Sequence, residues 1–133
     1  MTILDVFGRL MECYQQADLV FIGGSLVKAG GHNPLEAAVF GKPILFGPHM
    51  EDFEEIEEDL LAAGAALRVA DQQGLQEAFV AMAQQDEKRL TMSQRAKTAV
   101  LAQSGSADRI VRDLGRLLQE PDPSLFPAGI DRP

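Results

Sequence analysis

The sequence predicts an α/β fold, namely a partial Rossmann-like parallel sheet of about three strands with flanking helices. Short apolar runs alternate with segments of helical periodicity, and glycines or prolines close the apolar runs. Strands that alternate with helices in this way pair in parallel through right-handed crossovers. The 133 residues are 46% hydrophobic, which is enough for one packed domain. We expect this domain to occupy residues 1–120, and residues 121–133 to form a flexible, Pro-rich tail.

The first two predicted elements are a helix and a buried strand. Apolar residues recur at helical spacing ahead of Gln15, at Phe7, Leu10, Met11 and Tyr14. The apolar run of residues 19–22 ends at Gly23 and Gly24. This pattern is typical of a parallel strand that leads into a loop with a close neighbour.

A short helix and a second strand follow. Asn33 as N-cap, Pro34 at the first helical position and Gly41 as the stop predict a helix over residues 34–40. Residues 43–48 are an apolar run bracketed by prolines, which predicts the second buried strand.

After the second predicted strand, the sequence predicts an acidic, amphipathic helix that ends at Gly64. Its acidic side chains are expected to face solvent. Its apolar residues are Phe53, Ile56, Leu60 and Leu61. Residues 65–69 predict a third strand, and Asp71 is expected to cap the next helix. Two further amphipathic helices are predicted over about residues 87–103 and 107–118.

The negative charge is local. Seven of the 20 acidic residues lie between Glu51 and Asp59, and the remaining 13 nearly balance the 12 Lys and Arg residues. A nucleic-acid partner is disfavoured because phosphate affinity needs clustered basic residues. The single cysteine, Cys13, cannot form an internal disulfide, and no secretion signal or long apolar run is visible. A cytoplasmic setting is therefore expected.

The connection between the first strand and the short helix is the most informative stretch for function. Its two Gly-Gly pairs permit close backbone approach, and free N–H groups at a helix start suit an anion such as phosphate. Glu36 follows one turn later and can accept hydrogen bonds from two sugar hydroxyls, which suits a ribose. Neither the dinucleotide fingerprint nor the ATPase P-loop motif is present.

These residues resemble the C-terminal domain of 3-deoxy-D-manno-octulosonic acid (Kdo) transferases of lipid A biosynthesis. The resemblance covers about residues 5–69, and its motifs are Gly23-Gly24-Ser25-Leu26, Gly30-Gly31-His32-Asn33-Pro34-Leu35-Glu36, Gly47-Pro48-His49 and Phe53-Glu54-Glu55-Ile56. It implies a two-domain GT-B glycosyltransferase. The C-terminal domain of such an enzyme holds the CMP-Kdo donor, and the N-terminal domain holds the lipid acceptor and the catalytic base.

The resemblance also implies the donor-binding residues of this chain. Glu36 would bind the ribose of CMP, and Lys28 would either neutralise donor charge or be solvated. The other donor-binding residues would be Gly23, Gly24, Ser25, Gly30, Gly31, His32 and Asn33. No catalytic residue, metal or cofactor is expected in this chain, which has only two histidines and one cysteine.

On this resemblance the chain is expected to be a fragment with part of the donor site, inactive alone because it lacks the N-terminal domain. The full-length enzyme would act at the cytoplasmic face of the inner membrane, on a lipid A precursor. An unpaired edge of the first strand would favour homo-oligomers.

Other interpretations remain open from the residues themselves. The chain could belong to a sugar-nucleotide epimerase of GT-B architecture, or be a non-catalytic interaction module that associates through its sheet edge. Gly30 and Gly31 could form an ordinary turn, and Glu36 could bond back to Asn33 in a capping box. His32 and His49 could be ordinary loop histidines.

Overall fold

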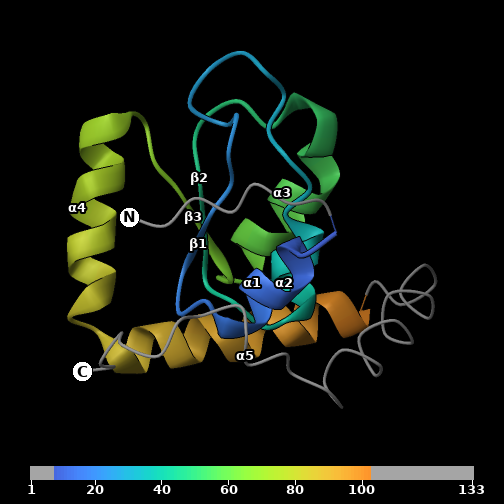
Figure 1. The fold of residues 1–133 in the computed structure, drawn as a ribbon, viewed down its shortest axis with the longest axis vertical. Helices are drawn as coiled ribbons and strands as arrows, with labels where there is room; N and C mark the ends of the chain where they lie inside the picture. Colours follow the sequence, from blue (N-terminus) through green and yellow to red (C-terminus); the bar gives the residue numbers. More distant parts are fainter. Residues whose placement is uncertain (1–7, 103–133) are drawn as a thin grey trace.

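The computed structural model describes residues 8–102, and the elements alternate between helix and strand as the sequence predicts (Figure 1). In chain order they are α1 (Leu10–Gln16), β1 (Val20–Phe21), α2 (Leu35–Val39), β2 (Ile44–Phe46), the 3-10 turn η1 (Glu51–Phe53), α3 (Glu54–Ala62), β3 (Ala66–Arg68), α4 (Gln72–Ala83) and α5 (Asp86–Ala102). The α/β fold class is confirmed. The predicted helix over 107–118 and the tail over 121–133 lie outside the described residues.

The three strands form one parallel sheet in the order β1-β2-β3, which confirms the predicted sheet. Val20 pairs with Ile44, and Ile44 pairs with Ala66 on its other side. Each strand is shorter than its apolar run, but flanking residues still bond to the neighbouring strand: the Ile22 N–H donates to the Leu45 carbonyl at 2.9 Å, and the Val69 N–H donates to the Phe46 carbonyl at 2.8 Å. Within the described residues β1 is an edge strand.

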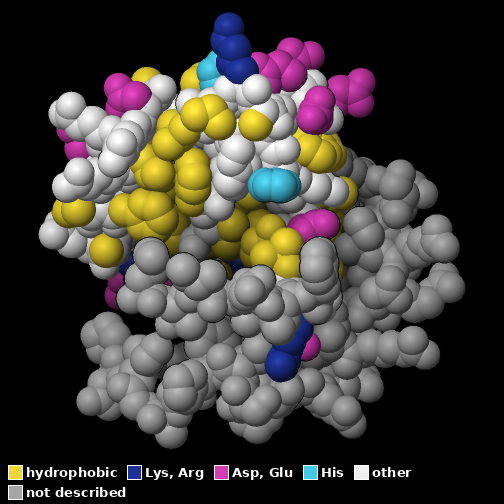
Figure 2. Space-filling view, turned by 45° about the horizontal axis from the view of Figure 1, so that its top comes forward, with side chains coloured by type: hydrophobic (Ala, Val, Ile, Leu, Met, Phe, Trp, Pro, Cys, Tyr) yellow, Lys and Arg dark blue, Asp and Glu magenta, His cyan; other side chains and the backbone are white. Residues whose placement is uncertain are grey.

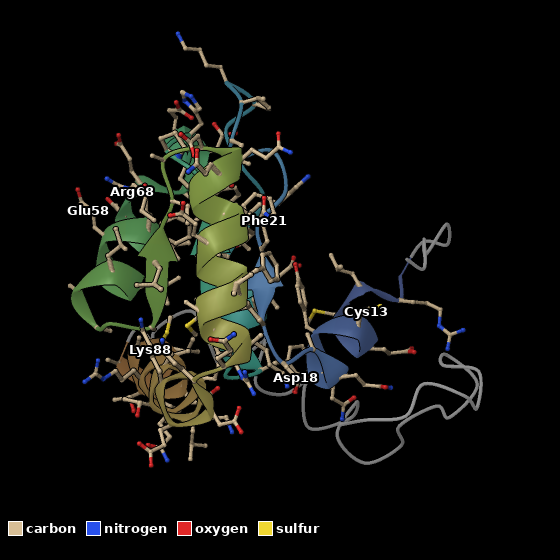
Figure 3. All side chains as sticks on the ribbon, turned by 90° about the vertical axis from the view of Figure 1, so that its left-hand side faces the viewer. Cys13, Asp18, Phe21, Glu58, Arg68 and Lys88 are labelled. Atoms are coloured by element: carbon tan, nitrogen blue, oxygen red, sulfur yellow. The ribbon has the colours of Figure 1, made fainter. Side chains whose placement is uncertain are left out.

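Helices cover both faces of the sheet (Figures 1 and 3). α1, α2 and α3 lie on one side, α4 stands alone on the other, and α5 runs below the sheet. The alternation of side chains along β2 matches these layers, because Ile44 and Phe46 point to the face of α2 and α3 while Leu45 points to the opposite face. All three side chains are fully buried.

Gly64 ends α3, as the sequence predicts, and the helix closes in a Schellman motif. The Gly64 N–H donates to the Leu61 carbonyl and the Ala65 N–H donates to the Leu60 carbonyl, both at 2.9 Å. Gly64 has a φ of 66°, a conformation that glycine adopts without strain. The motif turns the chain directly from α3 into β3.

One expectation about the acidic segment is wrong. Glu57 does not face solvent, since its side chain is only 5% exposed and accepts hydrogen bonds at 2.7 Å from Nε and Nη2 of Arg68. Arg68 ends β3, at the edge of the sheet opposite Phe21 (Figure 3). A buried carboxylate needs such a partner, so this pair fixes α3 against the strand that follows it.

The last two described helices agree with the sequence. The Asp71 carboxylate accepts a hydrogen bond from the Gly74 N–H at 2.9 Å and caps α4, as predicted. α5 packs against α2, and its residues Ala96 and Val100 belong to the core. No helix within residues 8–102 has both the length and the apolar character needed to cross a membrane.

The two glycines Gly64 and Gly74 provide a matched test of this fold. Gly64→Ala should lower the free energy of unfolding by about 1 kcal/mol, because alanine is strained at positive φ. Gly74→Ala should raise it by about 0.5–1 kcal/mol, since Gly74 is helical and a Cβ there meets only ordinary contacts at 3.6 Å or more. Urea unfolding measures both, and equal effects of the two substitutions would contradict the assigned helix ends.

Candidate functional site

Two loops meet at the carboxyl ends of β1 and β2, where ligands bind in open parallel sheets. The hydroxyl group of Ser25 joins them. It is fully buried, donates a hydrogen bond to the Ile22 carbonyl at 2.5 Å and accepts one from the Gly47 N–H at 2.8 Å. The His49 N–H in turn donates to the Ser25 carbonyl at 2.9 Å. The loop after β1 is therefore held against the loop after β2.

The glycines allow these loops to approach so closely. A Cβ at Gly47 would lie 2.2 Å from the Ser25 carbonyl oxygen, and a Cβ at Gly31 would lie 2.5 Å from the Met50 sulfur. A Cβ at Gly30 would lie 2.2 Å from a carboxylate oxygen of Asp52. Gly30 and Gly31 both have positive φ, of 77° and 71°. The positive φ of the second Gly-Gly pair thus favours glycine through the backbone itself, whatever ligand it binds.

A cavity of about 620 Å³ opens between these loops and α1. Five of its lining residues are apolar or aromatic, namely Leu10, Tyr14, Phe21, Ile22 and Phe53. The others are Gly23, Gly31, His32, Asn33, Glu36 and Asp52. Hydrophobic side chains gather on this end of the molecule, and charged side chains lie along the upper rim (Figure 2). An apolar cavity with a few polar groups is the usual form of a small-molecule site.

Glu36 lies in this cavity without a protein partner. Within residues 8–102 its carboxylate forms no hydrogen bond or ion pair, so the capping box with Asn33 is not formed. Asn33 instead accepts a hydrogen bond from the Leu35 N–H at 3.0 Å, and α2 begins one residue later than predicted. The Glu36 carboxylate is therefore available to accept hydrogen bonds from a ligand.

Tyr14 forms part of the opposite wall. Burial is the main cause that raises the pKa of its phenol, and the negative charge of Glu36 raises it further. The ring also packs against Phe40, with the ring centroids 6.4 Å apart. The pKa of the Tyr14 phenol thus depends on the charge of Glu36 in the cavity.

The structure brings five of the predicted donor-binding residues together at the cavity: Gly23, Gly31, His32, Asn33 and Glu36. Gly24 and Gly30 belong to the same loop but do not line the cavity. Ser25 lies behind the loop, and both of its hydrogen bonds go to the protein backbone. Lys28 is exposed and is not among the residues that line the cavity.

The sequence reasoning missed the apolar walls and Asp52. Leu10 and Phe53 were expected only as members of amphipathic helices. Asp52 was expected to be one of the solvated acids, at a position where the resembled family commonly has Asn. A signal was available for Phe53 only, because it follows the second strand closely. Segments next to the carboxyl ends of parallel strands are the ones that can surround a ligand.

The second histidine lies outside the cavity. His49 Nδ1 is 2.9 Å from a carboxylate oxygen of Glu51, and this hydrogen bond is the main cause that lowers the pKa of Glu51. Among residues 8–102 no three His, Cys, Asp or Glu side chains are grouped to hold a metal ion.

Ser25→Ala should lower the free energy of unfolding by about 2 kcal/mol, because the buried Gly47 N–H loses its acceptor. Ser93→Ala is the control, since Ser93 lies on α5 away from this site and its removal should change stability by no more than about 0.5 kcal/mol. Urea unfolding of the two variants measures the difference. A Ser25→Ala protein as stable as the control would show that the hydroxyl does not hold the loops.

Tyr14 is the only tyrosine and the chain has no tryptophan, so absorbance of tyrosinate reports this one group. Its titration midpoint should lie above the ordinary value of about 10, and Glu36→Gln should lower it. Because the folded state holds the phenolic proton more tightly, this group favours folding at neutral pH, and the contribution is lost as pH rises above about 10. Glu55→Gln, on the exposed side of α3, should leave the midpoint unchanged. If the native chain, Glu36→Gln and Glu55→Gln all had the same titration midpoint, the charge of Glu36 would not act on the Tyr14 phenol.

The chain is similar in sequence to several curated proteins. No family model matches the chain. Three curated relatives are named 3-deoxy-D-manno-octulosonic acid transferase: those of Bordetella pertussis (33% identity over 105 residues), Haemophilus influenzae (34% over 108) and Chlamydia pneumoniae (34% over 113). These matches cover 79–84% of this chain but only 24–26% of the relatives. The chain therefore spans about a quarter of their length.

A solved structure agrees with the sequence matches. The C-terminal CMP-Kdo binding domain of WaaA from Acinetobacter baumannii superposes with a TM-score of 0.69 and 28% identity. The match covers 73% of this chain and 51% of that one. The resemblance predicted from the sequence is thus confirmed: this chain is related by sequence to the 3-deoxy-D-manno-octulosonic acid transferases and by fold to the C-terminal domain of WaaA.

Proposed function

We propose that this chain contributes donor-binding residues to a glycosyltransferase that moves Kdo from CMP-Kdo to a lipid A precursor. The observation that carries the proposal is the cavity beside Glu36, at the carboxyl ends of β1 and β2. It lies in a fold shared with a domain described as binding CMP-Kdo. The sequence relatives, named for Kdo transfer, support the same function.

In the proposed complex each part of the cavity has a role. The Glu36 carboxylate accepts hydrogen bonds from the two ribose hydroxyls of CMP. The backbone of Gly31, His32 and Asn33 faces the phosphate, and the apolar wall that includes Phe21 and Phe53 contacts the flat base. N–H groups aimed at the phosphate stabilise the negative charge that develops on departing CMP, and this step needs no proton transfer from a side chain.

The rest of the reaction belongs to other parts of the proposed enzyme. A GT-B N-terminal domain supplies the lipid acceptor site and the base, and residues 1–120 act as part of the C-terminal domain. The whole enzyme works at the cytoplasmic face of the inner membrane. The β1 edge is the proposed contact for that domain or for a second copy, since an unpaired strand edge accepts another strand.

The Glu36 role is tested by calorimetry of CMP binding to the 133-residue chain. Glu36→Gln should weaken CMP binding by about 10-fold or more, because hydrogen bonds to a charged carboxylate are worth roughly 1.5–3 kcal/mol. Glu55→Gln removes the same charge from an exposed site on α3 and should leave the affinity within about twofold. If Glu36→Gln bound CMP as tightly as the control, the ribose contact would be refuted.

A further inference from the structure

Tyr14 lies in the wall of the cavity, and core packing explains only part of its side chain. Its ring packs against Phe40, and the whole residue is only 8% exposed. A phenylalanine would make the same ring contact. A hydroxyl group that is taken out of water loses free energy unless it finds a hydrogen-bond partner. The hydroxyl group of Tyr14 therefore needs an explanation of its own.

This hydroxyl group has no hydrogen-bond partner among residues 8–102. Within the same residues, no side-chain oxygen or nitrogen is fully buried without a hydrogen bond. The phenol oxygen must therefore lie in the small part of Tyr14 that remains accessible, and Tyr14 is one of the residues that line the cavity. The hydroxyl group is thus available to a molecule that enters there.

The carboxylate of Glu36 belongs to the same cavity and also has no partner in the described part of the chain. Tyr14 is on α1 and Glu36 is on α2, and these two helices pack against each other. The two groups are close enough for the charge of Glu36 to raise the pKa of the phenol, yet no hydrogen bond joins them. They therefore face one cavity without satisfying each other.

The two groups differ in the hydrogen bonds that they can form. An ionised carboxylate only accepts, whereas a phenol also donates. The raised pKa of Tyr14 keeps its proton in place at neutral pH, so the phenol can donate there. A ligand atom that bonds to both groups must donate to Glu36 and accept from Tyr14. An alcohol hydroxyl group does both, whereas an ionised phosphate oxygen only accepts and the amino group of a nucleobase only donates.

We infer that Tyr14 is a further ligand-binding residue, whose phenol donates a hydrogen bond to a ribose hydroxyl group that itself donates to Glu36. The inference rests on the proposed function, because it starts from the ribose contact of Glu36. It adds a donor on α1 to the acceptor on α2. A site that bonds a hydroxyl group in both directions rejects an analogue that lacks this group, since its own polar groups are then left unpaired. Helix α1 thus takes part in sugar recognition and is not only an apolar wall.

Calorimetry with CMP, 2′-deoxy-CMP and 3′-deoxy-CMP tests this contact in the 133-residue chain. Tyr14→Phe should bind CMP about fivefold more weakly than the native chain does, the size expected for one hydrogen bond from an uncharged donor. It should bind one of the two deoxy analogues at least as tightly as the native chain does, because that analogue lacks the shared hydroxyl group. Stability in urea should be retained, since the variant loses no hydrogen bond within residues 8–102.

Ser93→Ala is the matched control, because it removes a hydroxyl group from α5, outside the cavity lining. It should bind all three nucleotides as the native chain does. The inference is overturned if Tyr14→Phe binds CMP as tightly as Ser93→Ala does, or if it weakens the binding of all three nucleotides equally. In both cases CMP still binds and the proposed function stands. A native chain that binds none of the three nucleotides would instead refute the proposed function, and the inference with it.

Discussion

The buried hydroxyl group of Ser25 is the interaction on which the site depends. It accepts from one loop and donates to the other, and so aligns the loops that follow β1 and β2. Gly47 can then pack directly against the backbone of Ser25 and Leu26, where a Cβ would clash. This packing leaves a cavity between the loops and α1, and Glu36 is part of its lining.

The same packing explains why the site combines apolar walls with uncompensated acids. Among the described residues, the side chains of Glu36, Asp52, His32 and Asn33 supply most of the polar part of the cavity lining. Glu57, an acid of the same segment as Asp52, is instead paired with Arg68 and serves the fold. Acids five residues apart therefore have different roles because only one of them meets a cation.

Local sequence signals predicted most of the fold. Asp71 and Gly64 marked helix ends by short-range hydrogen bonds, and the apolar runs marked all three strands. The sequence could not place α1 as a wall of the cavity, or show that Glu57 is buried. Both depend on contacts between segments distant in the chain, and helical periodicity carries no information about them. The role of Ser25 was hidden for the same reason, since its partner Gly47 lies 22 residues away.

The central claim is that CMP binds between α1 and the two loops. It is tested most directly by a two-dimensional ¹H–¹⁵N NMR titration of the chain with CMP. The account predicts that shift changes concentrate at the backbone amides of Gly23, Gly31, His32, Glu36 and Phe53. Changes confined to α4 and α5, or no saturable change at all, would contradict it.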